Sequence, residues 1–94
     1  MSDRLPADWM CTLDERIIEY VAEDSLASPS LMTTAIQFDA TRRRIRERCE
    51  MLTDAGLIAP ISDDAQLFEV TREGQRYLAG DLDVEHQPQP RARG

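Results

Sequence analysis

Residues 41–58 read TRRRIRERCEMLTDAGLI, and they carry the clearest helical pattern in the chain. The apolar residues in this stretch recur at steps of four and three, at Ile45, Cys49 and Leu52. That spacing puts them on one stripe of a helix. Thr41 is a preferred residue at a helix start, and Gly56 suits the left-handed residue that stops a helix. We therefore predict a helix over residues 41–54.

Arginine fills most of the first half of this helix, at Arg42, Arg43, Arg44, Arg46 and Arg48. At about 100° per residue from the apolar stripe, Arg43 points nearly opposite, and Arg44 and Arg46 lie to the sides. Arg42 and Arg48 flank the edge of the core. The helix therefore presents a cationic end that is anchored from behind. An ordinary solvated face is the alternative, because arginine is a good helix former and neighbouring glutamates can pair with it.

The rest of the chain is acidic. Eighteen acidic and eleven basic residues give a net charge of −7, whereas residues 40–58 hold five arginines and three acids, a balance of +2. All eleven basic residues are arginine. An acidic surface with arginine in place of lysine resembles the composition of proteins from extreme halophiles. The negative net charge therefore argues less strongly against a nucleic-acid partner than it usually does.

The 94 residues suffice for one domain with a modest core, but not for a large enclosed substrate cavity. No apolar run approaches the length that crosses a bilayer, and the N-terminus lacks a signal-peptide pattern. We expect a soluble, cytoplasmic protein without a membrane partner. Cys11 and Cys49 stand at unrelated spacing, so we expect reduced thiols in apolar packing, with no metal and no cofactor.

A first helix is predicted ahead of the arginine-rich one. Residues 1–11 form an irregular arm whose Trp9 folds back onto the core. Thr12 and Glu15 form a capping box that starts a helix over residues 13–23. The apolar stripe of this helix comprises Leu13, Ile17, Ile18, Tyr20 and Val21.

A second, short helix follows. Ser28 caps it and Pro29 occupies its first position, and it ends near Gln37. The buried side of this helix consists of Met32, Ala35 and Ile36. Residues 38–40 then make the turn into the arginine-rich helix.

Past Gly56 the hydrophobic period changes. Short apolar or mixed runs at residues 57–61 and 66–70 flank a polar turn, which is typical of a two-stranded hairpin. Pro60 indicates that its strand lies at an edge.

Thr71 caps a last short helix, in which Gly74 permits the close approach of another element. The inward side of this helix comprises Tyr77 and Leu78, with a slight extension through Leu82 and Val84. Residues 85–94 have little to bury and are predicted to be a disordered tail.

The order of elements is helix, helix, helix, hairpin, helix. It predicts a mainly α fold with a small β-hairpin, a winged helix-turn-helix domain over residues 12–84. The second helix of such a pair enters the major groove of DNA, and here that helix carries the arginines. An arginine fork can donate two hydrogen bonds to guanine or hold a phosphate. The sequence does not assign each arginine to one kind of contact.

Four segments carry a resemblance to a known family: DWMCTLDERIIEYVAED, SPSLMTTAI, RRRIRERCEMLTDAGLI and FEVTREGQRYLAGDLD. Together they resemble the small haloarchaeal winged-helix proteins related to the halophage phi-H repressor and, more distantly, the MarR and ArsR regulators. The resemblance covers residues 8–84 and is most specific in LTDAGLI at 52–58 and VTREGQRYLAG at 70–80. It implies a homodimer that binds double-stranded operator DNA. By position, the DNA-binding residues fall on Thr41, Arg42, Arg43, Arg44 and Arg46, with Arg48 as a contact to the DNA backbone.

Two features depart from the family pattern. The predicted wing tip carries Asp63 and Asp64, where a DNA-binding wing more often has arginine or lysine. The segment QFDATRRR lacks the glycine often found in the turn of a helix-turn-helix. The first departure puts a wing contact with DNA in doubt, and neither changes the predicted fold.

We therefore predict a sequence-specific DNA-binding transcriptional regulator of the repressor type. The alternative is a winged-helix module for protein–protein interaction without direct DNA binding, since the acidic first helix and wing suit a basic partner. The sequence contains no nucleophile and base pair, glycine-rich phosphate loop or metal-ligand spacing, so we do not expect an enzyme. No residue is assigned to a small-molecule effector.

Overall fold

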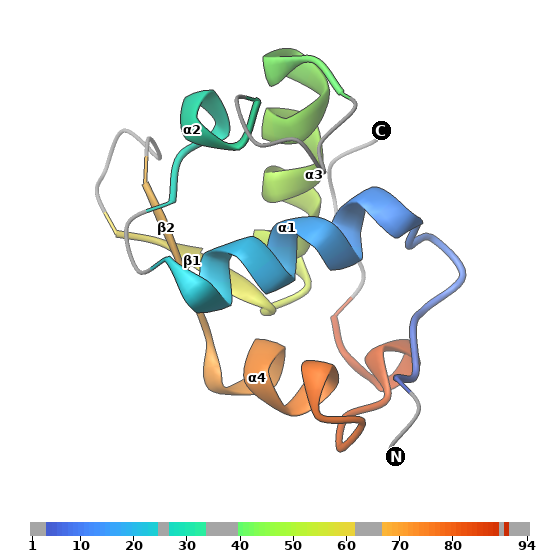
Figure 1. The fold of residues 1–94 in the computed structure, drawn as a ribbon. Helices are drawn as coiled ribbons and strands as arrows, with labels where there is room; N and C mark the ends of the chain where they lie inside the picture. Colours follow the sequence, from blue (N-terminus) through green and yellow to red (C-terminus); the bar gives the residue numbers. More distant parts are fainter. Residues whose placement is uncertain (1–3, 25–26, 34–39, 62–66, 89, 91–94) are drawn as a thin grey trace.

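The predicted order of elements is confirmed in the computed structural model of the chain, which describes residues 4–24, 27–33, 40–61, 67–88 and 90. The elements are α1 (Thr12–Glu23), α2 (Pro29–Thr33), α3 (Arg42–Asp54), β1 (Ile58–Pro60), β2 (Phe68–Val70), α4 (Arg72–Leu78) and a 3-10 turn η1 (Val84–His86). In Figure 1, α1 crosses the middle of the molecule, with α2 and α3 on one side and α4 on the other. The fold is thus mainly helical with a two-stranded antiparallel hairpin.

Helix α1 begins one residue earlier than the sequence predicts. Cys11 is the N-terminal cap, and its backbone N–H donates to the Asp14 carboxylate at 2.9 Å. The predicted capping box of Thr12 and Glu15 is therefore wrong, because Thr12 already lies inside the helix. The predicted apolar stripe is confirmed: its buried members are Ile17, Ile18 and Val21, with Leu13 and Tyr20 partly buried against the core.

The start of α2 is confirmed, because the Leu31 N–H donates to the Ser28 hydroxyl at 3.1 Å and Met32 is fully buried. The predicted continuation to Gln37, with Ala35 and Ile36, lies outside the described residues, as do residues 38 and 39 of the turn. Helix α3 is capped as predicted, since the Thr41 hydroxyl accepts a hydrogen bond from the Arg44 N–H at 3.1 Å.

The end of α3 is also confirmed, because Gly56 adopts a φ of 83°. The predicted stripe of Ile45, Cys49 and Leu52 is fully buried. Burial raises the pKa of the Cys49 thiol to about 12. The second cysteine, Cys11, is partly exposed, and both thiols are free.

The hairpin pairs Ile58 with Val70, Ala59 with Glu69 and Pro60 with Phe68, in strands shorter than the predicted runs. Among the described residues β1 pairs with β2 alone, so Pro60 lies in an edge strand, as predicted. The acidic turn at Asp63 and Asp64 lies outside the described residues.

Helix α4 begins as predicted, where the Gly74 N–H donates to the Thr71 hydroxyl at 3.0 Å. A Cβ atom on Gly74 would lie 2.2 Å from the Leu57 carbonyl oxygen, so this glycine does permit a close approach. The predicted extension of the helix is wrong, because Gly80 turns the chain at a φ of 81° after Leu78. Leu82 and Val84 are still buried, but they belong to the segment beyond that turn.

Both ends of the folded part lie against one another. Leu5 forms a parallel bridge with Asp83, Ala7 is buried, and Trp9 packs against the core as predicted. The Asp8 N–H donates to the Glu85 carboxylate at 2.8 Å. The predicted tail therefore starts too early, because Glu85 and His86 belong to η1. Of the helices in the described part of the chain, none has the length and apolar character needed to span a membrane.

Candidate nucleic-acid interface

Helices α2 and α3 form the pair in which a DNA-reading helix was predicted. They lie next to each other, and the first turn of α3 stands at an outer end of the molecule, away from α4 (Figure 1). Three fully buried side chains, Ile45, Cys49 and Leu52, hold the opposite side of α3 against the core. The first turn of α3 is therefore both exposed and fixed from behind.

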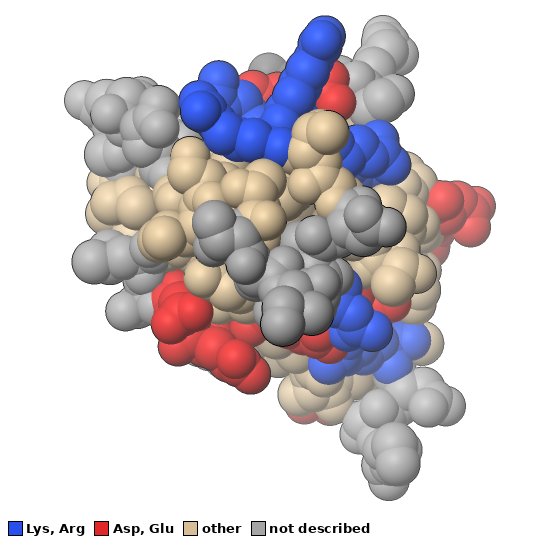
Figure 2. All heavy atoms as spheres, turned by 45° about the horizontal axis from the view of Figure 1, so that its top comes forward, with Lys and Arg blue, Asp and Glu red and all other residues tan. Residues whose placement is uncertain are grey.

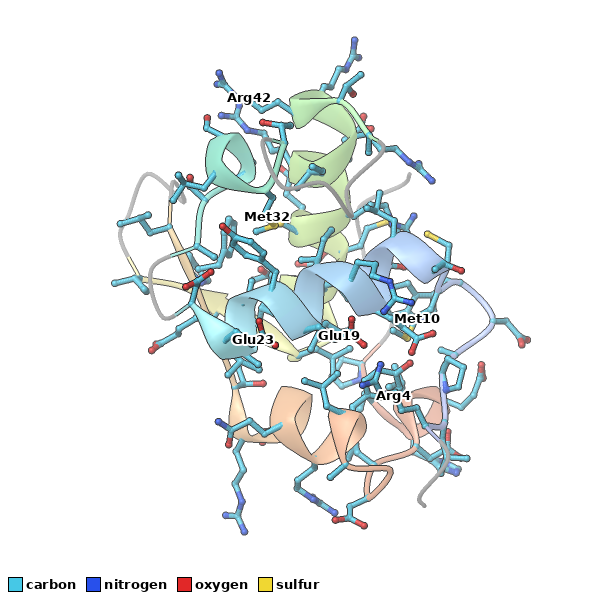
Figure 3. All side chains as sticks on the ribbon, viewed as in Figure 1. Arg4, Met10, Glu19, Glu23, Met32 and Arg42 are labelled. Atoms are coloured by element: carbon cyan, nitrogen blue, oxygen red, sulfur yellow. The ribbon has the colours of Figure 1, made fainter. Side chains whose placement is uncertain are left out.

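The side chains predicted to contact DNA gather at this end. Thr41, Arg42, Arg43, Arg44 and Arg46 are all exposed. Arg42 extends outward from the start of α3 (Figure 3), and Figure 2 shows arginine side chains clustered over this face of the molecule. We call the group Arg42, Arg43, Arg44 and Arg46 the arginine cluster. The structure thus places these five predicted residues at the same exposed end of α3.

The arginine cluster is largely uncommitted to the protein itself. Arg43 Nε lies 3.9 Å from Glu47 Oε2, and the Arg43 side chain is 90% exposed. A pair this long and this solvated contributes little, so the Arg43 fork remains available for another partner. Within the described residues, the structure records no ion pair for Arg42, Arg44 or Arg46.

The position of the arginine cluster is unfavourable for the helix alone. The N-terminal end of a helix carries a partial positive charge, and cations there destabilise it by a few tenths of a kcal/mol each. The first turn of α3 contains no acidic residue that would offset this. The same end attracts anions, because helix N-termini and arginines both favour phosphate. This weakens the alternative of an ordinary solvated face, which would place acids rather than arginines there.

Arg48 is placed differently from the prediction. Its Nε donates to Asp14 Oδ1 at 2.7 Å and its Nη2 to Asp14 Oδ2 at 2.5 Å. The Arg48 side chain is 6% exposed and that of Asp14 is fully buried. The hydrogen bonds to Asp14 raise the pKa of Arg48, against the opposing effect of burial. Because this guanidinium is buried and bidentately paired, it is not accessible for the expected contact between Arg48 and the DNA backbone.

Trp9 covers the same guanidinium. The Trp9 carbonyl accepts from Arg48 Nη2 at 3.0 Å, and the centre of the Trp9 ring lies 5.9 Å from the guanidinium carbon. That distance is within the range of a cation–π contact. The N-terminal arm therefore contacts α3 at Trp9, through both its backbone carbonyl and its ring.

A shallow hollow lies between the last turns of α3 and the β1–β2 hairpin. It has a volume of about 130 Å³ and is lined by Glu50, Thr53, Asp54, Pro60 and Phe68. Pockets for drug-sized ligands usually enclose about 300 to 1,000 Å³, so this hollow is small for an effector. In the part of the chain that the structure describes, no group of three or more acidic, histidine or cysteine side chains is arranged to hold a metal ion.

The chain is similar to known proteins in sequence and in structure. Residues 1–89 match the family described as winged helix-turn-helix phage repressor. The repressor protein of Halobacterium phage phiH is 30% identical over 82 residues, which cover 84% of this chain and 90% of that protein. The crystal structure of the PhiH1 repressor-like protein from Haloarcula marismortui matches with a TM-score of 0.87 at 25% identity, over 95% of this chain and 99% of that one. The resemblance found in the sequence is thereby confirmed.

Proposed function

Because this chain belongs to the winged helix-turn-helix phage repressor family, we propose that it is a sequence-specific DNA-binding regulator, a transcriptional repressor that reads the major groove with α3. The observation that carries this proposal is the arginine cluster at the exposed, positively polarised end of a helix that is anchored from behind. The name of the phage phiH protein, a repressor, supports the assignment to transcriptional control.

The arginine cluster supplies two kinds of DNA contact. An arginine that reaches a base edge donates two hydrogen bonds to the O6 and N7 atoms of guanine and discriminates by about 1 to 3 kcal/mol. An arginine that reaches a phosphate fixes the position of the helix without reading sequence. Thr41, whose hydroxyl oxygen already accepts from the Arg44 N–H, keeps its own proton for a nearby phosphate oxygen.

High salt limits how such a helix can bind. If the chain works in the concentrated salt that its arginine-for-lysine composition suggests, the Debye length is about 3 Å at 1 M and long-range attraction to DNA is nearly lost. Binding then rests on short, directional arginine hydrogen bonds. The acidic residues Asp63 and Asp64 do not suit a phosphate contact, so we assign most of the DNA contact to α3.

We also propose that the chain binds DNA as a homodimer, with two copies of α3 reading two half-sites about one helical turn apart. Two linked copies raise the effective affinity without any new kind of contact. A regulator of this kind acts where the genome lies, which we take to be the cytoplasm. Light scattering that finds only monomers at every concentration, with and without DNA, would refute the dimer.

The test of the proposed function starts from selection of bound fragments out of genomic DNA, carried out in high salt. Gel-shift titrations at matched salt then compare the unmodified chain with Arg43→Ala and Arg46→Ala. We expect both variants to bind the selected fragment much more weakly while circular dichroism shows an intact fold. Arg72→Ala is the control, because Arg72 is exposed on α4, away from the first turn of α3.

Unchanged affinity in Arg43→Ala and Arg46→Ala would refute the role of α3. A chain that enriches no DNA fragment, but binds a basic protein, would instead support a protein–protein interaction module.

A further inference from the structure

The contact between α1 and α3 contains one buried ion pair. Asp14 and Arg48 meet through two hydrogen bonds, at 2.7 Å and 2.5 Å, with both side chains almost removed from solvent. The remaining buried side chains of α3 are uncharged, namely Ile45, Cys49, Met51 and Leu52. The pair is therefore a directional contact within a largely apolar interface.

Asp14 also takes part in the start of α1. Its Oδ2 atom, which binds Arg48, accepts a hydrogen bond from the Cys11 N–H at 2.9 Å. Arg48 in turn donates to the Trp9 carbonyl at 3.0 Å. One carboxylate and one guanidinium thus connect α3 to the first turn of α1 and to the N-terminal arm. Any rotation or sliding of α3 along α1 would break several of these hydrogen bonds at once.

Stability does not explain why this site holds charges. The free-energy cost of removing a carboxylate and a guanidinium from water offsets most of the attraction between them. Apolar side chains of similar volume therefore often stabilise a fold equally well. An apolar pair, however, does not fix the orientation of one helix on another. Aliphatic contacts tolerate small rotations, whereas a bidentate pair between an arginine and a carboxylate holds only in a narrow range of geometries.

Arg48 lies one helical turn beyond Arg44, on the same rigid helix as the arginine cluster. The side chains of a helix reach about 5 to 6 Å from its axis, so a rotation of about 20° would move their ends by about 2 Å. Hydrogen bonds to base edges tolerate only about 0.5 Å of variation in length. A small change in the orientation of α3 would therefore remove base contacts while leaving the arginines near the DNA.

We propose that the Asp14–Arg48 pair sets the orientation of α3 on α1 and thereby aims the arginine cluster at the base edges, an inference that rests on the proposed function. Arg48 is in this sense a positioning residue and not a DNA contact. The pair determines how well the chain distinguishes its operator from other DNA. It contributes much less to the affinity for DNA in general, because non-specific binding depends mainly on charge.

The main test replaces both charges, in Asp14→Leu with Arg48→Met. Affinity is measured for the selected operator fragment and for an unrelated duplex of equal length, well below the unfolding temperature. We expect non-specific affinity within about twofold of the unmodified chain, and a loss of operator affinity of roughly five- to 150-fold, the equivalent of one bidentate base contact. Equal discrimination in the double variant and the unmodified chain would overturn the proposal.

Two further variants keep this test decisive. Arg48→Lys retains the charge but not the bidentate geometry, and we expect it to fold and to lose discrimination in the same direction. If the double variant does not fold, the Arg48→Lys variant tests the proposal by itself. Ile18→Val lowers stability through a fully buried residue of α1 while both charges of the pair stay in place, and should leave discrimination unchanged. A loss of discrimination in Ile18→Val equal to that in Arg48→Lys would show that general destabilisation is the cause.

A measurement without DNA separates this proposal from the proposed function. Residual dipolar couplings of backbone amides report the direction of α3 relative to α1 in solution. We expect the couplings of the Arg48→Lys variant to fit a shifted or broadened orientation of α3. Couplings that fit the unmodified orientation would overturn the positioning role, whatever the chain binds. A shifted α3 in a chain that binds no DNA would refute the proposed function alone.

Discussion

Under the proposed function, the salt dependence of DNA binding would show which member of the arginine cluster holds a phosphate and which reads a base. Each phosphate that a protein neutralises adds about 0.9 to the slope of log affinity against log salt concentration. The exposed cluster has four members, Arg42, Arg43, Arg44 and Arg46, so it supplies a slope of at most about 3.6 for each α3 that binds. A fourfold increase in salt would then weaken binding by about 150-fold, and by about 40-fold after the loss of one phosphate contact.

The perturbation is alanine substitution of each member in turn. Alanine is the best helix former, and all four side chains are exposed, so the fold should be unaffected. We expect the loss of a phosphate-holding arginine to lower the slope by about 0.9 and to weaken all duplexes alike. The loss of a base-reading arginine should weaken only the operator, by about 1 to 3 kcal/mol, with little change in slope.

Fluorescence anisotropy with a labelled duplex, titrated over a range of salt concentrations, measures both quantities. Arg72→Ala serves as the matched control, since Arg72 is exposed on α4, at the opposite side of the molecule from the first turn of α3. Its slope and affinity should equal those of the unmodified chain. The reasoning fails if all four α3 variants keep the original slope and affinity. A slope well above about 3.6 per α3 would show that cations outside the cluster hold the DNA.

Two predictions concern the fold that supports this helix. Gly74→Ala should lower the free energy of unfolding by about 1 to 3 kcal/mol, because its Cβ would lie 2.2 Å from the Leu57 carbonyl oxygen. Thermal unfolding checks this against the exposed Gln75→Ala, and equal midpoints would contradict it. Although burial opposes it, hydrogen bonds from Arg4 and Arg16 lower the pKa of Glu19, whose contact with Arg4 is visible in Figure 3. The stabilisation from these contacts is present above the unfolded pKa of about 4.5 and is lost as pH falls through the lower pKa of the folded state. Glu19→Gln should therefore have a smaller free energy of unfolding than the unmodified chain at pH 7, and this difference should disappear in acid. A difference in urea unfolding that does not vary with pH would contradict this second prediction.

Local signals account for most of the fold that was predicted. A threonine at a helix start and a glycine at a helix end act through hydrogen bonds and φ angles within a few residues, so Thr41, Gly56 and Thr71 could be assigned from sequence. The exposed positions of Arg43, Arg44 and Arg46 also follow from helical spacing, whereas Arg42, which that spacing puts at the edge of the core, is exposed as well. The start of α1 was missed because Thr12 is the better cap by residue type, whereas Asp14 determines the actual cap.

The pairing of Asp14 with Arg48 depends on two elements 34 residues apart, and no local rule reports it. The sequence nevertheless contains a signal for this pair. Arg48 stands three residues after Ile45 and four before Leu52, which puts it directly beside the buried stripe of α3. Asp14 likewise precedes Ile18 by four residues on the buried stripe of α1. Opposite charges on the apolar stripes of two helices indicate a buried pair between them.

Function and stability are consequently divided along the length of α3. Its first turn carries a cap and exposed arginines but little buried surface, and it places cations where the helix dipole disfavours them. Its later turns carry the buried stripe and Arg48. A local rule that is broken with no compensating ion pair among the described residues is expected at a functional site. Under the two proposals, a change of sequence in the first turn would alter which DNA is read, while the later turns would keep the orientation of the helix constant.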